Sequence, residues 1–276
     1  IYTLSLHDAL PIWGDCVIPS VVYYPDKGQP EIGRRAASRQ FTEPSRVIRS
    51  VKRVLGLPSS APLVRRYAAA SPFKIECSGE RPVFRMWSGD VAPEQVAAAI
   101  LARVRDLAEA RFGGVVRRVV MAMSAAAPPG YRDAVIRAAR IARLEVMDLI
   151  AEPIAGALAL DLHRECVNRR IIVCDFGGGT FDVSAVVQND SRFTPVAIAG
   201  DSLLGGDDLD DALAEEIAGK VFRRSRYDMH KDAVRWSELV FRCESAKRQL
   251  SSAREAPLAM RGAYIEAGQP QDLRLT

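Results

Sequence analysis

The segment that most constrains the fold is Ile171–Val187, which reads IIVCDFGGGTFDVSAVV. A short, partly β-branched apolar run leads to Asp175, three glycines and Thr180 follow, and apolar and polar residues then alternate from Phe181. Short β-branched runs and period-two alternation are typical of strands, so the segment predicts a strand, a glycine turn and a second strand. The Walker loop and the dinucleotide fingerprint both lead from a strand into a helix, so neither motif fits.

A glycine hairpin of this kind has two interpretations. Without side chains, its backbone lets amide groups approach an anion such as a phosphate closely. Asp175, at the end of the first strand, is then placed to serve a hydrated Mg²⁺, which prefers one or two carboxylates with waters and phosphate oxygens. The alternative is an ordinary β-hairpin with a glycine tip, although three glycines exceed what a tight turn needs. This stretch alone leaves both open.

Composition limits the class of protein. A chain of 276 residues with 48% apolar residues is long enough to bury a core and to form two lobes. The net charge of +4 is small and the basic residues are scattered among acids, which argues against a nucleic-acid partner. The five cysteines are an odd number without CxxC spacing, as expected in a reducing compartment. No apolar run reaches membrane-spanning length, so we expect a soluble, cytoplasmic protein without a membrane partner.

The two ends of the sequence differ in character from the rest. Residues 1–12 contain no initiator Met, no basic region and no clear periodicity, and the string LSLHDALPI resembles translated sequencing adaptor. We therefore expect this segment to be foreign and exclude it from the fold argument. The last residues end without a turn or helix-stop signal, so we expect a chain truncated at both ends.

Between the ends, hydrophobic periodicity and the positions of proline and glycine predict a chain of strands and helices. A strand at 17–24 precedes a helix that begins at Pro44 and ends at Gly56, and residues 57–89 are loop-like apart from a strand near Val83–Trp87. The remaining predictions are a helix from Pro93 to Gly113, a buried strand Val115–Met123, a helix after Gly130, a strand Val146–Ile150, a helix from Glu152, a helix after Gly206 and a long helix Val234–Leu250. This order is typical of an α/β fold.

Several polar residues stand at positions that suit chemistry, and each has a plainer explanation. A lysine on a helix, such as Lys52, is usually a solvated surface residue. Glu152 precedes a helix-opening proline, where an acid complements the helix dipole, and the same holds for most acids of 207–211. The last group shares one helix face at i, i+3, i+4 and i+7, which is typical of a solvated ion-pair face: Glu244, Lys247, Arg248 and Ser251.

Taken together, six segments resemble the nucleotide-binding domain of the seventy-kilodalton heat-shock chaperones (DnaK-type), in the actin-like ATPase superfamily. Any one is weak, but all six occur in order across most of the chain. They are Ile18–Val22, Val51–Gly56, Leu144–Ala159, Cys174–Ser184, Gly200–Asp210 and Cys243–Ser251.

The resemblance implies a two-lobed, ribonuclease H-like fold with an ATP cleft. Lobe I would comprise residues 13–169, with a small subdomain at about 18–89 and a core subdomain at about 90–169, and lobe II would comprise 170–276. Lys52 would be the catalytic lysine that reaches the γ-phosphate and the attacking water, and Glu152 would orient that water. Asp175 would hold Mg²⁺ through waters, and Thr180 would lie beside the γ-phosphate.

The family pattern also implies the rest of the nucleotide site. The backbone amides of Gly177, Gly178 and Gly179 would bind the β- and γ-phosphates, and Glu244, Lys247, Arg248 and Ser251 would hold the adenosine. An intact parent would hydrolyse ATP to drive a client-protein cycle with a J-domain co-chaperone and a nucleotide-exchange factor.

The chain also departs from the family. The first phosphate loop and the peptide-binding domain have no counterpart, so we expect the isolated chain to bind ATP weakly or not at all. Ser124 replaces a proline that the family uses as a conformational switch, while Arg132 matches its arginine partner. The segments Ser50–Arg53 and Gly200–Asp208 are also similar to the iron–sulfur-assembly branch of these chaperones. The alternatives are an actin-like ATPase or sugar-kinase relative that is no chaperone, and a remnant that does not hydrolyse ATP.

Overall fold

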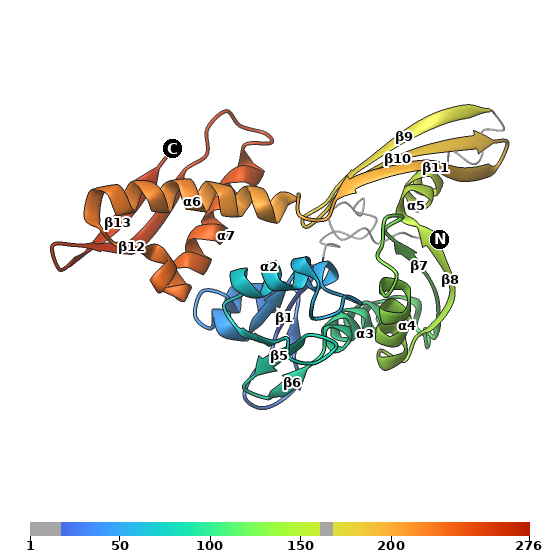
Figure 1. Cartoon of the computed structure of the whole chain (residues 1–276), viewed down its shortest axis with the longest axis horizontal. Coiled ribbons are helices and arrows are strands. Elements are labelled where there is room, and N and C mark those ends of the chain that lie inside the picture. Colours follow the sequence, from blue (N-terminus) through green and yellow to red (C-terminus); the bar gives the residue numbers. More distant parts are fainter. Residues whose placement is uncertain (1–17, 161–167) are drawn as a thin grey trace.

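The computed structural model describes residues 18–160 and 168–276, a mixed α/β chain with several small sheets (Figure 1). The foreign segment expected at 1–12 and the cysteines Cys16 and Cys166 lie outside the described residues. In the described part the three other cysteines are free thiols. Likewise, no helix there is long and apolar enough to cross a membrane.

The N-terminal region is built on a three-stranded antiparallel sheet. Strand β1 (Val21–Tyr23) lies between β2 (Glu31–Ile32) and β3 (Val47–Arg49). The other elements of the N-terminal region are α1 (Arg34–Arg39), η1 (Pro44–Arg46), η2 (Val51–Arg53) and α2 (Pro62–Ala70). A second small sheet there consists of β4 (Lys74–Glu76), β5 (Val83–Met86) and β6 (Gly89–Val91). A shared core of Val22, Ile48, Val64 and Phe84, each fully buried, holds these elements together.

The helix predicted from Pro44 to Gly56 is wrong. The segment forms a 3₁₀ turn, strand β3 and a second 3₁₀ turn, because Val47 and Ile48 pair with β1 opposite Tyr23 and Val22. β-Branched side chains suit a pleated, buried surface, and the partner strand outweighs the helical spacing. Ser50, with a φ of 50°, then turns the chain out of the strand.

The loop-like prediction for 57–89 missed helix α2, whose signal was Pro62 at a first-turn position followed by good helix formers. The strand prediction near Val83–Trp87 is confirmed as β5, which ends at Met86.

Two helices and a parallel strand pair follow. Helix α3 (Pro93–Phe112) ends at Gly113, as predicted, with a left-handed φ of 69°. It packs on α4 (Tyr131–Ile141), and both contribute to a core against β7 (Arg118–Met123) and β8 (Glu145–Ala151). The predicted strand at 115–123 exists but is not buried, since Val115 is exposed and every residue of β7 is exposed or half-buried. Helix α5 (Glu152–Ala159) follows directly.

The second half of the chain begins with an antiparallel sheet. Strand β10 (Phe181–Asn189) lies between β9 (Arg169–Phe176) and β11 (Arg192–Asp201). The sheet leads into α6 (Gly206–Ser225), η4 (Met229–Lys231), α7 (Ala233–Gln249) and the hairpin of β12 (Leu258–Glu266) and β13 (Gln269–Leu275). These last elements share one core, centred on Leu239, Cys243 and Ala263.

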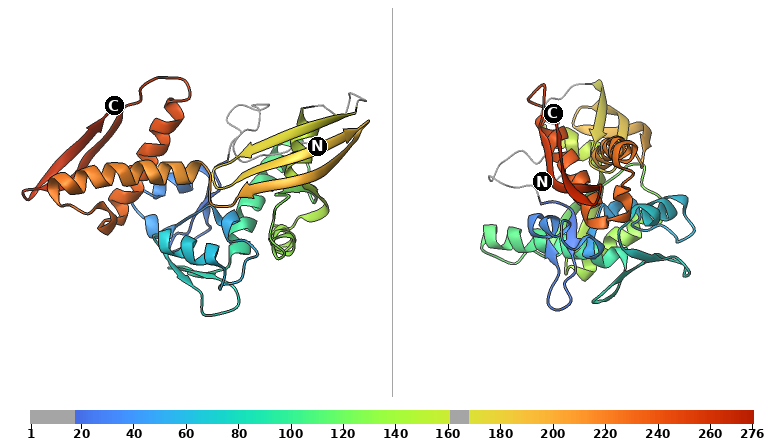
Figure 2. Two further views of the ribbon diagram at one scale, coloured as in Figure 1. Left: turned by 45° about the horizontal axis from the view of Figure 1, so that its top comes forward. Right: turned by 90° about the vertical axis from the view of Figure 1, so that its left-hand side faces the viewer.

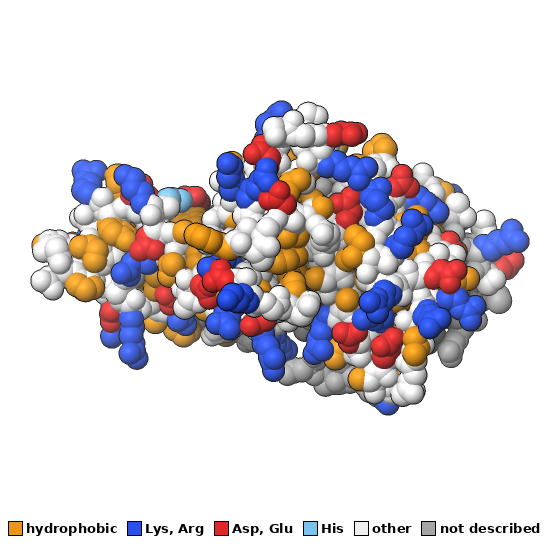
Figure 3. Space-filling model, turned by 90° about the horizontal axis from the view of Figure 1, so that it is seen from below, with side chains coloured by type: hydrophobic (Ala, Val, Ile, Leu, Met, Phe, Trp, Pro, Cys, Tyr) orange, Lys and Arg blue, Asp and Glu red, His pale blue; other side chains and the backbone are white. Residues whose placement is uncertain are grey.

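The views agree on how these parts are arranged. The tip of the β9–β10 hairpin and the start of α6 meet above the N-terminal region, close to η2 (Figures 1 and 2). From below, acidic and basic side chains are interspersed over the visible face, with hydrophobic side chains between them (Figure 3).

Candidate functional site

The predicted strand, glycine turn and strand are confirmed by β9 and β10. Their register places Phe176 opposite Phe181 and Asp175 opposite Asp182. The amide of Gly177 donates to the carbonyl of Thr180 at 2.9 Å and closes the turn. The rings of Phe176 and Phe181 meet edge to face, with centroids 5.4 Å apart, below the tip. The glycine loop is therefore a defined tip on a paired hairpin.

The start of α6 holds this tip through backbone hydrogen bonds. The amide of Gly206 donates to the carbonyl of Gly177 at 3.0 Å, and the amide of Asp207 donates to the carbonyl of Gly178 at 2.7 Å. Gly205 is required for this approach, because a Cβ atom there would overlap the Gly178 carbonyl. In the described part of the chain, no group accepts a hydrogen bond from the amides of Gly178, Gly179 and Thr180.

Lys52 and Glu152 form an ion pair across 100 residues of sequence. The Lys52 Nζ lies 2.7 Å from the Glu152 Oε1, with Lys52 in the η2 turn and Glu152 at the first position of α5. Burial lowers the pKa of Lys52, but the Glu152 carboxylate, helped by Tyr131 and Asp175, outweighs that effect and raises the pKa above its ordinary value. Lys52 is therefore a cation throughout the physiological range.

The backbone around η2 explains why Lys52 points this way. Gly56, with a φ of 75°, lies against Gly130, and a Cβ atom at either position would collide with the carbonyl of the other. Next to this crossing, Leu55 packs on Tyr131 and Ala134 of α4. The tight approach presses the turn onto the start of α4, so that Lys52 faces the N-terminus of α5.

Asp175 suits the role of an outer magnesium ligand. It is an exposed residue at the end of β9, beside the glycine tip, and its charge contributes to the raised pKa of Lys52. Mg²⁺ needs only one or two carboxylates when phosphate oxygens and waters complete its shell. Among the described residues, no group of three or more His, Cys, Asp or Glu could hold a metal ion. The residues thus fit a magnesium ion that arrives with phosphate.

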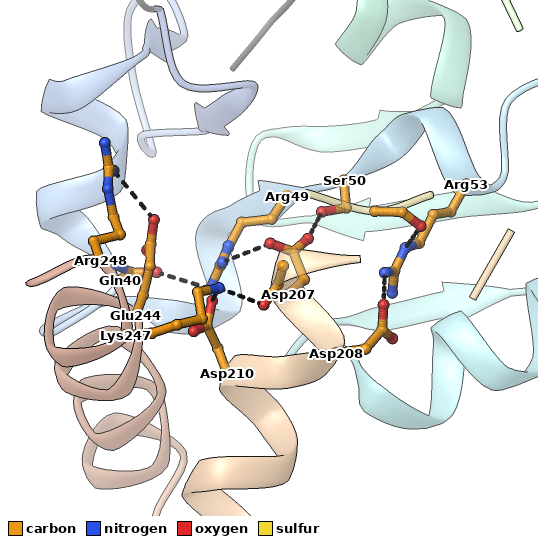
Figure 4. Close-up of polar contacts among 12 residues, drawn as sticks. Gln40, Arg49, Ser50, Arg53, Asp207, Asp208, Asp210, Glu244, Lys247 and Arg248 are labelled. Carbon is orange, nitrogen blue, oxygen red and sulfur yellow. Dashed lines mark hydrogen bonds and ion pairs between the residues drawn. The ribbon is translucent and has the colours of Figure 1, made fainter. Parts of the chain in front are cut away.

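The acids at the start of α6 have partners that the sequence did not suggest. Asp207 accepts a hydrogen bond from the Ser50 hydroxyl and lies 3.6 Å from the Arg49 guanidinium. Asp208 pairs with Arg53, whose Nε donates to the Gly179 carbonyl at 3.1 Å (Figure 4). Helix-dipole compensation explains their position but not these contacts. Arg53 is the functional candidate that the sequence reasoning missed, and its place next to Lys52 was the available signal.

The predicted adenosine-binding face of α7 is only partly assembled. Lys247 donates to the Gly206 carbonyl at 2.6 Å and to Asp210 at 2.8 Å. Glu244 and Arg248 form an i, i+4 ion pair at 3.5 Å, with Arg248 largely exposed. Ser251 lies beyond the last helical residue, Gln249, in a turn, so the four residues do not share one helix face.

Asp210, next to this face, is a carboxylate in an unusually buried position. It is 1% exposed and its Oδ2 accepts from Lys247, while its buried Oδ1 has no hydrogen-bond partner in the part of the chain that the structure describes. Burial raises the pKa of Asp210 to about 6, an effect that Lys247 only partly offsets.

Ser124, at the end of β7, links the two sheets. Its hydroxyl donates to the Asp182 carboxylate at 3.2 Å and accepts from the amide of Ala126 at 3.2 Å. A proline at this position could not make the first bond. Arg132 is exposed on the first turn of α4.

The model of the Hsp70 protein family matches residues 13–276, which is nearly the whole chain. Members of this family share the actin-like ATPase fold, bind ATP with Mg²⁺ and work with client proteins and co-chaperones, and the mixed α/β architecture with its glycine hairpin agrees with that fold. The resemblance inferred from the six segments is confirmed, and the chain belongs to the Hsp70 protein family.

Proposed function

We propose that this chain binds Mg-ATP weakly at the β9–β10 tip and that, in the intact parent, it contributes the hydrolytic site of a DnaK-type chaperone. The observation that carries the proposal is the cluster of three amides, at Gly178, Gly179 and Thr180, that find no acceptor among the described residues. Adjacent backbone amides directed to one side form an anion-binding concavity. A phosphate group would supply acceptor oxygens to these amides.

The ion pair of Lys52 and Glu152 supports hydrolysis in addition to binding. Phosphoryl transfer depends mainly on positioning and on stabilising the charge that develops on the phosphate oxygens. The Lys52 ammonium provides that charge near the tip, and Glu152 is within reach to orient an attacking water. Mg²⁺, held through Asp175 and phosphate oxygens, would neutralise phosphate charge when bound.

The adenosine end rests on Glu244, Arg248 and Ser251, with Lys247 already engaged by Asp210. We further propose that the protein is cytoplasmic and acts on client proteins with a J-domain co-chaperone and a nucleotide-exchange factor. The family relationship supports this part of the proposal.

Backbone amide NMR of the chain, titrated with Mg-ATP to millimolar concentration, tests the proposal. We expect the resonances of Gly178, Gly179 and Thr180 to move most, and adenosine alone to leave them unchanged. Phosphate release, measured in parallel, should fall in Glu152→Gln. Binding without phosphate release would identify a non-hydrolysing relative. Absence of any change at the three amides would refute the proposed nucleotide site.

A further inference from the structure

The glycine tip is held by all three of its successive carbonyl groups. The carbonyls of Gly177 and Gly178 accept from the amides of Gly206 and Asp207, and the carbonyl of Gly179 accepts from the Arg53 side chain at 3.1 Å. Two of these anchors are backbone groups of one helix start, while the third is a single side chain. The third anchor is therefore the one that a substitution can remove.

Because of peptide geometry, the hydrogen bonds that fix these carbonyls also fix the directions of the amides that follow them. In a planar trans peptide, the carbonyl and the amide of the next residue point in opposite directions. The Gly179 carbonyl shares its peptide with the amide of Thr180, so fixing that carbonyl toward Arg53 fixes the Thr180 amide on the opposite side. Corresponding bonds fix the amides of Gly178 and Gly179.

Arg53 is itself held in place. Its side chain is 13% exposed, and its terminal nitrogen pairs with Asp208, which is 21% exposed, on α6 (Figure 4). A planar guanidinium can meet two acceptors in a fixed fork, which an ammonium on a flexible stem does not reproduce. Arg53 thus joins three parts of the molecule: the η2 turn, the hairpin tip and the start of α6.

We propose that Arg53 is a positioning residue that fixes the Gly179 carbonyl and thereby orients the Thr180 amide for phosphate. Asp208 aims the guanidinium. The side chain acts from behind the tip and touches no phosphate itself. This inference rests on the proposed nucleotide site, but its structural part can be tested without any nucleotide.

The first experiment measures ¹⁵N relaxation of the nucleotide-free chain. In Arg53→Met, we expect the order parameters of Gly179 and Thr180 to fall from about 0.85 to below about 0.6. Asp208→Asn, which keeps the Nε contact but loses the charge, should give a smaller fall and serves if Arg53→Met does not fold. The matched control is Arg85→Met, because Arg85 also pairs with an aspartate, Asp90, but lies on the exposed β5–β6 hairpin. Unchanged order parameters in Arg53→Met, or in Asp208→Asn if that variant alone folds, would overturn the inference.

The second experiment compares ligands. In Arg53→Met, the affinity for Mg-ATP should fall about tenfold while the affinity for adenosine stays constant, because only the phosphate contacts depend on the tip. A merely structural role would weaken both ligands equally and would contradict the proposal. If the unchanged chain binds no Mg-ATP, the proposed function fails, and the relaxation measurement still decides the role of Arg53.

Discussion

Two lysine–carboxylate pairs in this molecule have nearly the same length but differ in the burial of the carboxylate. Lys52 and Glu152 are 2.7 Å apart, with their side chains 38% and 21% exposed. Lys247 and Asp210 are 2.8 Å apart, but Asp210 is 2% exposed at its side chain, and Lys247 also bonds the Gly206 carbonyl. The first pair is half-buried, so water can reach both of its side chains. The second pair is a buried structural link, and a broken buried pair leaves a charge without solvent.

The largest expected effect comes from breaking the buried pair. Lys247→Met should lower the free energy of unfolding by about 3 kcal/mol at pH 7, because the buried Asp210 carboxyl loses its cationic partner and must either stay charged or take up a proton. The loss should shrink at pH 5, where the carboxyl takes up a proton. Urea denaturation at both pH values measures this.

Lys220→Met is the matched control for that substitution, because Lys220 pairs with Glu216 on the surface of α6. Its effect should stay within about 0.5 kcal/mol. Equal losses in the two variants would show that the comparison between exposed and buried pairs is wrong.

The half-buried pair of Lys52 and Glu152 should matter for turnover and little for stability. In the intact parent, Lys52→Ala should slow ATP hydrolysis about a hundredfold or more while leaving nucleotide binding largely intact, because one charge-stabilising donor is lost. Its free energy of unfolding should change by less than about 1 kcal/mol, since Glu152 can be hydrated. Single-turnover phosphate release together with thermal unfolding measures both; equal loss of binding and turnover would make Lys52 structural.

The raised pKa of Asp210 predicts a pH dependence of stability. Between its ordinary pKa near 4 and the folded value of about 6, the folded state binds the proton more tightly than the unfolded chain. The free energy of unfolding should therefore fall as the pH rises through this window, by roughly 3 kcal/mol. The difference between the protein and Asp210→Asn isolates this slope. A flat difference from pH 4 to pH 7 would contradict the assignment.

The smallest effect is expected at His230. Its ring nitrogens contact Glu215 at 2.9 Å and Asp228 at 3.2 Å, and the ring stacks on Trp236. Burial lowers the pKa of His230, but the two carboxylates outweigh it and raise the pKa above 6.5. Their stabilisation is complete below pH 6.5 and is lost as the pH rises through the higher folded value.

Comparison of the protein with His230→Gln between pH 6 and pH 8 tests this dependence. The exposed ion pairs limit the effect to about 0.5 kcal/mol. A difference that grows with rising pH would have the wrong sign for a stabilised imidazolium.

The sequence by itself determined the local chemistry of this protein. Period-two alternation around three glycines predicted the β9–β10 hairpin, and proline and glycine punctuation predicted α3 and α5. These features depend on the backbone preferences of residues that are neighbours in the sequence, and those preferences follow from the residue types alone. The ordered segments also identified the family, because the order and spacing of motifs can be read from the sequence without any knowledge of contacts.

Only the tertiary structure decided which strands pair and which charges meet. Residues 44–56 have helical spacing, yet Val47–Arg49 within them form strand β3, because β1 lies beside them as a partner. The resemblance gave Lys52 a catalytic role and Lys247 a place at the adenosine, but only the structure shows that Lys247 pairs with the buried Asp210. Arg53 gained its role from a carbonyl 126 residues away. Pairing, burial and charge compensation are properties of segments distant in sequence, so no local pattern could assign them.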